Sequence, residues 1–280
     1  MNPETSSPAF PAIAFIGGGN MARSLIGGLL QAGAAPADIH VAEPVTALRD
    51  ALRSDFGVQV HADAAAAARE AGTWVLAVKP QVMREVCEGL AALARERQPL
   101  VVSIAAGITG RQIARWLGGN VAVVRTMPNT PALLGAGVTG LHANAAVSVA
   151  QRRVADALLA SAGERVWVED EALMDAVTGV SGSGPAYVFL LAESLQAAGE
   201  AEGLPADAAR RLAVQTLLGA ARMLVHDDTP AAELRRRVTS PNGTTQAAIE
   251  SFERDGFREI VARAVHAARV RGAELAADNE

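Results

Sequence analysis

Short apolar runs alternate with amphipathic segments along the first half of the chain. The runs are a few residues long and are bounded by glycine, proline or polar residues, which is typical of strands buried on both faces of a sheet. Strands are expected at residues 12–16, 38–42, 58–60, 73–78, 100–107 and 121–127. Helices are expected at residues 21–33, 45–56, 62–71 and 81–97. Alternating strands and helices predict a parallel sheet covered on both faces, a doubly wound α/β domain.

The pattern changes near Val168. Beyond it we identify no convincing strand, and the apolar positions follow helical spacing, as at Val188, Leu191 and Leu195. A long helical segment is expected at 205–225, followed by two more helices up to Glu280. We therefore predict a first domain over residues 1–168, with 1–10 as a disordered or extended tail, and an all-α domain over 169–280. Alanine-rich helices of this kind can build a dimer, although the same composition also fits ordinary core packing.

Composition narrows the class of protein. The formal net charge of -5 and the absence of a basic stripe argue against nucleic acid as a partner. No window reaches the roughly 18 apolar residues of a membrane span, and the first residues lack the pattern of a signal peptide, so we expect a cytoplasmic protein. The single cysteine, Cys87, excludes an internal disulfide and a cysteine-based zinc site, and we interpret it as a buried, inert thiol. No metal site is expected.

The sequence FIGGGNMA contains the order G-x-G-x-x-A at Gly17, Gly19 and Ala22, directly after the first strand and at the start of a helix. Gly17 permits the tight turn, Gly19 lets the backbone approach a pyrophosphate, and Ala22 allows close packing of helix on strand. The N–H groups and the dipole of the helix start favour an anion. In this context the motif predicts a Rossmann-type dinucleotide site.

The dinucleotide itself is left open by the residues. Glu43 ends the second strand, where a carboxylate accepts from the ribose 2′-OH of NAD and repels the 2′-phosphate of NADP. If its side chain is turned aside, Arg49 or Arg23 can reach that phosphate. Alternatively, Glu43 only ends a strand before Pro44. NADH and NADPH therefore both remain candidates.

Two further stretches follow strands at the expected cofactor edge, AVKP at 77–80 and SIAAG at 103–107. Ligands of open α/β sheets bind outside the carboxyl ends of the strands. Lys79 is the only lysine of the chain, beside twenty-four arginines. It is either a catalytic acid, a positive charge near phosphate or ribose, or an ordinary surface lysine.

Three polar stretches, RTMPNTPALLGAG at 125–137, SGSGPAY at 181–187 and TSPNGTT at 239–245, are expected to be loops. The last two precede helices. In TSPNGTT we expect the N–H groups of Gly243, Thr244 and Thr245 to be free at a helix start, which is a site for a carboxylate or phosphate. Ordinary capping by Ser240 or Thr244 is the alternative.

Together, IGGGNMA, AVKP, SIAAGI, MPNTP, DAVTGVSGSGPAY and RRVTSPNGTT resemble the pyrroline-5-carboxylate reductase family, and the resemblance extends from Ile13 to about Leu275. It implies hydride transfer from NADPH or NADH to 1-pyrroline-5-carboxylate, giving L-proline, the last step of proline synthesis. The cofactor positions that it implies are Ile16, Gly17, Gly18, Gly19, Asn20, Met21, Glu43, Ala77, Val78, Lys79, Pro80, Ala105 and Ala106. The substrate positions are Asn129, Ser181, Asp228, Gly243, Thr244 and Thr245.

Within that set, the resemblance places the hydroxyl of Thr245 near the ring nitrogen, as an orienting partner. Glu43 stands where relatives commonly carry a small polar residue, which puts the cofactor preference in doubt. The resemblance further implies a homodimer through the helical domain and, in many members, a ring of five dimers. In such a dimer Thr245 belongs either to the active site of the partner subunit or to that of its own subunit.

The reduction of an imine agrees with the lack of a histidine in the motifs. A protonated cyclic imine becomes a neutral amine on accepting hydride, so alignment and exclusion of water matter more than a strong acid. All five histidines lie outside the motifs. A β-hydroxyacid dehydrogenase, the nearest rival, needs a lysine in the helical domain, and that domain has none. A regulatory protein that binds NAD without turnover is the second rival.

Overall fold

The computed structural model describes residues 11–226 and 228–278, and the expected tail at 1–10 lies outside them. The chain divides into two compact units. Unit 1 runs up to Ser183 and also includes the end of the chain from Ala267, whereas unit 2 spans Gly184–His266. The predicted division near Val168 and the observed one after Ser183 differ, and the last helix contributes to both units.

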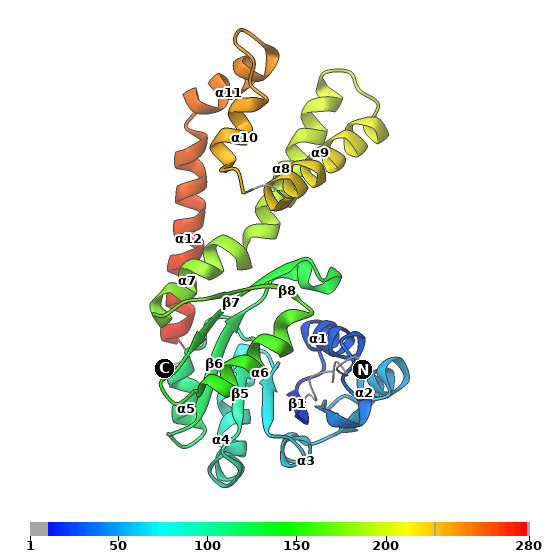
Figure 1. Cartoon of the computed structure of the whole chain (residues 1–280), viewed down its shortest axis with the longest axis vertical. Coiled ribbons are helices and arrows are strands. Elements are labelled where there is room, and N and C mark those ends of the chain that lie inside the picture. The colour runs from blue at the N-terminus through cyan, green and yellow to red at the C-terminus, as the bar shows by residue number, and fades with distance from the viewer. Residues whose placement is uncertain (1–10, 227, 279–280) are drawn as a thin grey trace, which may run out of the picture. The chain divides into compact units, whose positions relative to one another are not determined.

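Unit 1 contains an eight-stranded sheet, in the order β3-β2-β1-β4-β5-β6-β7-β8 (Figure 1). The strands are β1 (Ile13–Ile16), β2 (Ile39–Ala42), β3 (Gln59–His61), β4 (Thr73–Leu76), β5 (Leu100–Ser103), β6 (Ala122–Met127), β7 (Gly137–Ala143) and β8 (Gly163–Trp167). The six expected strands are present and are all parallel. β7 and β8 were not expected, and the sheet is not wholly parallel because β7 is antiparallel to β6. A short connection suffices for an antiparallel pair, whereas parallel strands need a crossover.

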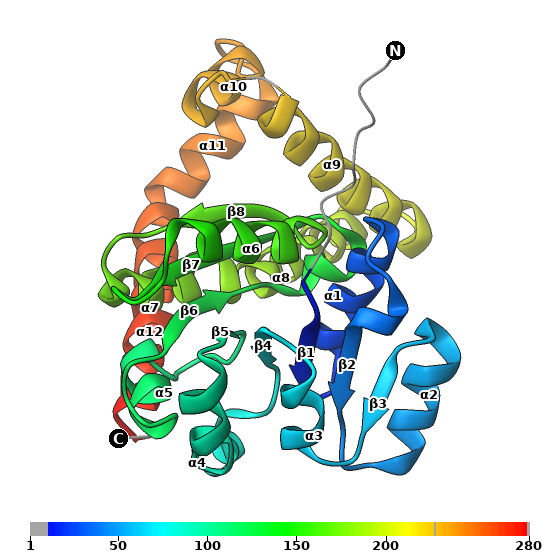
Figure 2. The same cartoon turned by 60° about the horizontal axis from the view of Figure 1, so that its bottom comes forward.

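Two apolar cores flank the sheet, as expected for the doubly wound α/β arrangement. β1 contributes to both, because alternate residues of a strand point to opposite faces. Ile13 and Phe15 pack with α1, α2 and α6, whereas Ala14 and Ile16 pack with α3, α4 and α5. Figure 2 shows α6 and α4 on opposite sides of the strands. The helices are α1 (Asn20–Gln31), α2 (Thr46–Phe56), α3 (Ala64–Arg69), α4 (Pro80–Arg97), α5 (Gly110–Trp116) and α6 (Val149–Ala160).

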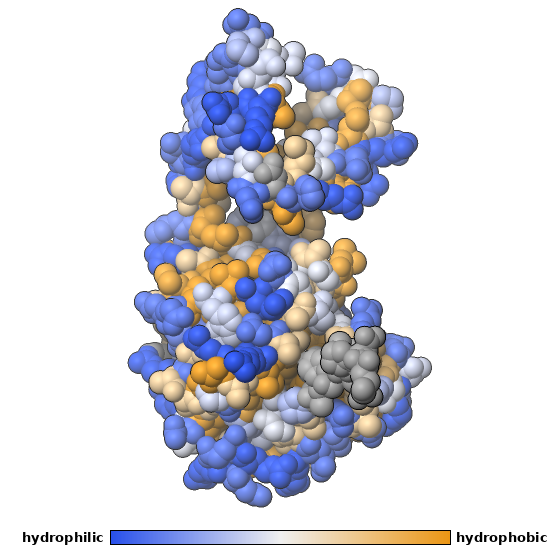
Figure 3. Space-filling view, in the orientation of Figure 1, coloured by the Kyte–Doolittle hydropathy of each residue, from blue (hydrophilic) through white to orange (hydrophobic). Residues whose placement is uncertain are grey.

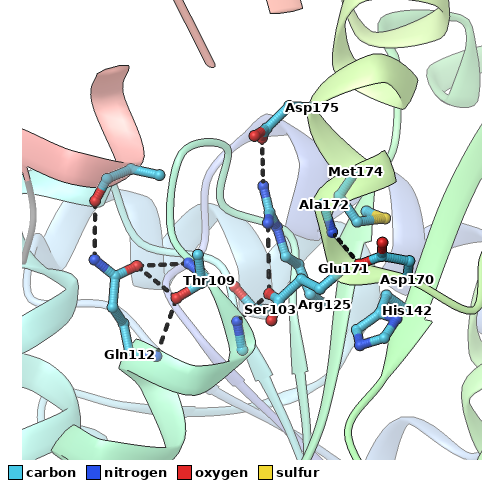
Figure 4. Close-up of polar contacts among 12 residues, drawn as sticks. Ser103, Thr109, Gln112, Arg125, His142, Asp170, Glu171, Ala172, Met174 and Asp175 are labelled. Atoms are coloured by element: carbon cyan, nitrogen blue, oxygen red, sulfur yellow. Dashed lines mark hydrogen bonds and ion pairs between the residues drawn. The ribbon is translucent and has the colours of Figure 1, made fainter. Parts of the chain in front are cut away.

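The segment after β8 is helical, as expected, but it belongs to the first unit. It comprises a 3-10 turn at Glu171–Leu173, α7 (Met174–Val177) and a π-helical turn at Thr178–Gly182. Arg125, on β6, is only 4% exposed, and its guanidinium pairs with the carboxylates of Glu171 (3.4 Å) and Asp175 (3.1 Å). Figure 4 shows this ionic cluster. Because the cluster ties the segment to the sheet, the boundary falls after Ser183.

Unit 2 consists of helices, in agreement with the predicted all-α part. They are α8 (Gly184–Ala201), α9 (Ala206–His226), α10 (Ala231–Arg237), α11 (Thr244–Arg254) and the first part of α12 (Phe257–Asp278). Three helices follow His226 rather than the two that were expected, because the chain between α9 and α11 forms α10.

Few side chains of unit 2 are buried within a single chain. Among its described residues the buried ones are Ala209 and Ala213, both on α9. Large apolar side chains are exposed, including Phe189 (66%), Leu190 (62%) and Val225 (89%). Apolar residues on the surface of the helices are visible in orange in Figure 3. Exposed apolar surface on this scale marks an interaction face.

Candidate active site

The expected cofactor residues meet at one edge of the sheet. β2, β1, β4 and β5 are neighbours and parallel, so their carboxyl ends lie side by side. Backbone pairing continues past the strands: the N–H of Gly17 donates to the carbonyl of Ala42 (2.9 Å), and that of Ala77 donates to the carbonyl of Ile16 (2.8 Å). AVKP is therefore hydrogen-bonded to Ile16, the residue directly before the glycine turn, and both stretches lie at this edge, which is the usual ligand position in such sheets.

The glycine turn has room for a diphosphate. Gly17 has φ +107°, and a Cβ there would lie 2.6 Å from the carbonyl oxygen of Ala77. Gly19 is the N-cap of α1 with no side-chain cap, and a Cβ there would meet nothing within 4 Å. Gly19 and Asn20 are exposed. The first N–H groups of α1 thus face open space and fit the pyrophosphate of a dinucleotide.

Glu43 is turned toward the glycine turn and is only 8% exposed. Its Oε2 accepts from the N–H of Gly18 (3.2 Å), and its Oε1 accepts from the N–H of Val45 (3.0 Å). The alternative in which this side chain is turned aside does not occur in this structure. A carboxylate therefore stands beside the turn, at the end of β2.

The two arginines that were candidates for a 2′-phosphate are engaged elsewhere. The guanidinium of Arg49 donates to the backbone carbonyls of Glu43 and Pro44, both at 2.7 Å. Arg23 forms an ion pair with Asp55 and lies over the ring of Phe56, 5.0 Å from its centroid.

The remaining cofactor positions follow β4 and β5. Lys79 is exposed and is the N-cap of α4. After β5, Ala105 is buried and Ala106 is exposed. A Cβ at Gly107 would lie 3.0 Å from the Cβ of Leu275. The end of α12 thus packs on the turn that holds Ala105 and Ala106.

A hydrogen bond from α5 also reaches the end of α12. Nε2 of Gln112 donates to the carbonyl of Ala276 (2.9 Å), and Thr109 and Gln112 form the capping box of α5 (Figure 4). Sequence reasoning did not identify this support. The capping box T-x-x-Q was a readable signal for the start of α5, but its partner on α12 was not.

Two expected substrate residues, Asn129 and Ser181, are in contact in unit 1. Nδ2 of Asn129 donates to the backbone carbonyl of Ser181 (3.1 Å), while its Oδ1 accepts from the N–H of Val138 (3.0 Å). The Ser181 hydroxyl donates to the carbonyl of Val177 (3.0 Å). Asn129 thereby connects the start of β7 with the π-helical turn, a deviation often found at functional sites.

The other substrate positions lie in unit 2. Asp228 is exposed between α9 and α10, and Thr244 and Thr245 open α11. Gly243 is the N-cap of α11 and has no side-chain cap, so ordinary capping by Ser240 or Thr244 does not occur. Within the described residues, no protein acceptor meets the N–H groups of Thr244 and Thr245.

The expectation of a free N–H at Gly243 is wrong, because this group donates to the carbonyl of Ser240 (3.0 Å). The preceding residue, Asn242, has φ +57°, and its N–H donates to the side chain of Gln246 (2.7 Å). The turn is thus closed by its own hydrogen bonds. It presents two N–H groups and the Thr245 hydroxyl at the start of a helix, which suits an anionic ligand.

Burial raises the pKa of the Cys87 thiol to about 12, in agreement with an inert thiol. The described part of the chain contains no group of three or more His, Cys, Asp or Glu side chains placed to hold a metal ion. None of the helices at residues 11–226 and 228–278 is both long and apolar enough to cross a bilayer.

Comparison with known proteins gives consistent matches over both units. Residues 171–275 match the family model for pyrroline-5-carboxylate reductase dimerisation, and residues 12–107 match that for NADP oxidoreductase, coenzyme F420-dependent. A pyrroline-5-carboxylate reductase from Pseudomonas aeruginosa is 52% identical over 266 residues, which cover 95% of this chain and 97% of that protein.

Solved structures agree with these matches. The structure of a pyrroline-5-carboxylate reductase from Coxiella burnetii has a TM-score of 0.91 at 41% identity, with 95% of this chain and 98% of the other covered. A pyrroline carboxylate reductase from Plasmodium falciparum with NADP bound has a TM-score of 0.83 at 27% identity, with 95% and 98% covered. With the glycine turn, the helical unit and the hydroxyl-bearing helix start in place, the chain belongs to the pyrroline-5-carboxylate reductase family.

Proposed function

We propose that the protein reduces 1-pyrroline-5-carboxylate to L-proline with NADPH or NADH. The observation that carries the proposal is the pair of helix starts that have no side-chain cap. One, at α1, follows the glycine turn; the other, at α11, carries Thr244 and Thr245. The first suits a diphosphate and the second suits a carboxylate. Because the chain belongs to the pyrroline-5-carboxylate reductase family, we assign both helix starts to the same reaction.

The reduction needs binding and orientation more than acid catalysis. A reduced nicotinamide supplies the hydride. The hydride bonds to C5 of the protonated imine, the electron pair of the C=N bond moves to nitrogen, and the product is a neutral secondary amine. No further proton has to be delivered during that step. The chain must therefore align the two rings and exclude water, for which fixed backbone donors are well suited.

Thr245 is proposed to orient the substrate ring. Its hydroxyl accepts a hydrogen bond from the N–H of the protonated imine, while the N–H groups at the start of α11 bind the carboxylate. Asn129, Ser181 and Asp228 remain proposed residues of the substrate site. Because Asn129 is 9% exposed and bonded to two backbone groups, we assign it a positioning role.

The direct test is the oxidation of NADPH and of NADH at the nicotinamide absorbance band in the presence of pyrroline-5-carboxylate. Oxidation that depends on the substrate is expected. Oxidation with neither cofactor, by a protein that still binds them, would instead favour a regulatory protein that binds the dinucleotide without turnover.

Thr245→Ala should lower kcat/KM for pyrroline-5-carboxylate about tenfold, the loss expected for one hydrogen bond to a charged group. Cofactor affinity should stay unchanged, because the glycine turn is untouched. Thr245→Ser keeps the hydroxyl and should retain most activity. An equal loss of cofactor affinity in Thr245→Ala would show that the loop has a structural role only.

We further propose a homodimer through unit 2, supported by its exposed apolar side chains and by its match to the dimerisation model. A ring of five dimers and action in the cytoplasm are finer proposals. Light scattering on the purified protein distinguishes a dimer from a decamer, and cell fractionation tests the location.

Within the dimer, we propose that Thr245 serves the partner's cofactor. Mixed dimers of Thr245→Ala and Gly19→Ala subunits test this arrangement. If Thr245 acts across the dimer, each mixed dimer holds one site with both groups intact and recovers about half of the activity of the unaltered dimer. If it acts within its own chain, both sites are damaged and no recovery occurs.

A further inference from the structure

The end of β2 differs from the rest of the cofactor edge because it carries a buried acid. Glu43 is 8% exposed, and both of its carboxylate oxygens accept backbone hydrogen bonds, from Gly18 and from Val45. Gly18 belongs to the glycine turn, so the carboxylate is fixed next to the proposed diphosphate site. In this fold the adenosine ribose lies at the end of the second strand. We infer that Glu43 makes the cofactor site selective for NADH over NADPH, an inference that rests on the proposed dinucleotide function.

The hydrogen bonding of the carboxylate suits a ribose diol. An ionised carboxylate has about four lone-pair positions. Two are taken by the N–H groups of Gly18 and Val45, which lock the side chain in place. The other two can accept from the 2′- and 3′-hydroxyls of NADH. The 2′-phosphate of NADPH is a dianion that has no proton to donate to the carboxylate. Its negative charge would also lie in contact with that of Glu43.

Rotation of Glu43 out of the way would break two hydrogen bonds in a poorly hydrated position. It would also leave the N–H of Gly18 without its acceptor, and a buried donor without a partner is costly. Close packing adds to this constraint: a Cβ at Gly18 would lie 2.6 Å from Cδ1 of Leu52 and 3.4 Å from the Cβ of Glu43. The carboxylate is therefore a fixed part of the site.

The arginines nearby do not compensate for the acid. Arg49 donates to the carbonyls of Glu43 and Pro44 and, through its second nitrogen, to the hydroxyl of Thr46 (3.0 Å). Arg23 is paired with Asp55. To bind a 2′-phosphate, either guanidinium would first have to give up these partners. The electrostatic environment thus favours a neutral diol over a phosphate.

The test measures cofactor binding without substrate, from nicotinamide fluorescence or by calorimetry, and kcat/KM with each cofactor. We expect the unaltered enzyme to bind NADH at least about tenfold more tightly than NADPH, a difference of ~1.4 kcal/mol. Glu43→Gln removes the charge at nearly constant size, and Glu43→Ser also opens space. Both should shift the ratio of affinities toward NADPH by about tenfold or more, chiefly through a gain for NADPH.

Asp50→Ser is the matched control. Asp50 lies on α2, is exposed and pairs with Arg53 (3.2 Å), so the variant removes one negative charge from the same region but not from the site. The ratio of its affinities for NADH and NADPH should stay within about twofold of the ratio for the unaltered enzyme. Melting temperatures of all variants check that the fold is kept, and the unaltered enzyme tests the inference even if one variant fails to fold.

If the unaltered enzyme binds NADPH as tightly as NADH, the inference is overturned. It is also overturned if folded Glu43→Gln keeps the same ratio of affinities for the two cofactors. Failure of the proposed reaction has a different signature. In that case neither cofactor is oxidised with pyrroline-5-carboxylate, while the preference in binding is still measurable.

Discussion

Replacing Gly17 with alanine puts a methyl group where the backbone of Ala77, directly after the neighbouring strand β4, already lies. The residue has φ +107°, which costs a non-glycine residue about 1–2 kcal/mol. The new Cβ would also lie 2.6 Å from the carbonyl oxygen of Ala77, closer than real Cβ atoms approach other atoms. Overpacking of this kind costs about 1–3 kcal/mol. Gly17→Ala should therefore lower the free energy of unfolding by about 2–5 kcal/mol, and relief of the overlap would displace Ala77.

Gly19→Ala, in the same turn, should behave in the opposite way. Gly19 has φ -69° and ψ -178°, which alanine adopts readily, and its Cβ would meet nothing within 4 Å. Alanine restricts the conformations of the unfolded chain, which stabilises the folded protein by about 0.4–1 kcal/mol. Alanine is also a poorer N-cap than glycine, which offsets a similar amount. Stability should thus change by less than ~0.5 kcal/mol. The methyl group would instead occupy the space proposed for the diphosphate and cost about tenfold to a hundredfold in cofactor affinity, equivalent to one charge-assisted hydrogen bond.

The assay combines urea unfolding with cofactor binding for the two variants and the unaltered protein. The comparison separates the two functions of the turn, since one glycine serves the fold and the other serves the ligand. Normal cofactor affinity in folded Gly19→Ala would refute the placement of the diphosphate at α1. Unchanged stability in Gly17→Ala would refute the argument from its backbone conformation.

Two further predictions concern charge in unit 1. Arg125→Ala leaves the carboxylates of Glu171 and Asp175 without their shared partner and should lower the free energy of unfolding, measured in urea, by about 3 kcal/mol. This is the low end for a buried pair, because both acids are partly exposed. An unchanged midpoint would contradict a structural role for the cluster. His40 lies 3.2 Å from His61 between nearest ring nitrogens, and burial, followed by the charge of His61, lowers its pKa from 6.5. The unfolded chain therefore takes up this proton more readily, so stability should fall as pH drops below about 6.5, and His40→Gln should flatten that dependence; an equal slope in the variant would exclude His40 as its source.

The part of the fold that could be predicted is the part with strong local signals. Strands buried on both faces appear as uninterrupted apolar runs, as in β4 and β5. β8 has no such run, because it lies at the edge of the sheet and exposes Glu164 and Arg165. Charged residues are common on edge strands, where they discourage pairing with other chains. β7 contains two glycines, which weaken the signal of a strand.

The candidate site was predictable to a similar degree. The glycine turn and the start of α11 could be located because glycine, asparagine and hydroxyl residues before a helix are local patterns. Their hydrogen bonds could not be predicted. The bond between Gly243 and Ser240 depends on the left-handed conformation of Asn242. The bond between Asn129 and Ser181 joins residues 52 positions apart.

The last helix shows why the two units could not be separated by sequence position alone. Periodicity in α12 describes one continuous helix, and a local pattern assigns it to the domain in which it begins. Its end nevertheless packs in unit 1, where the carbonyl of Ala276 accepts from Gln112 across 164 positions of sequence. That contact adjoins the turn of Ala105 and Ala106, two of the proposed cofactor residues, through Leu275 and Gly107. The end of α12 thus supports a loop of the cofactor edge. Substitutions at this end should therefore lower cofactor affinity as well as the free energy of unfolding.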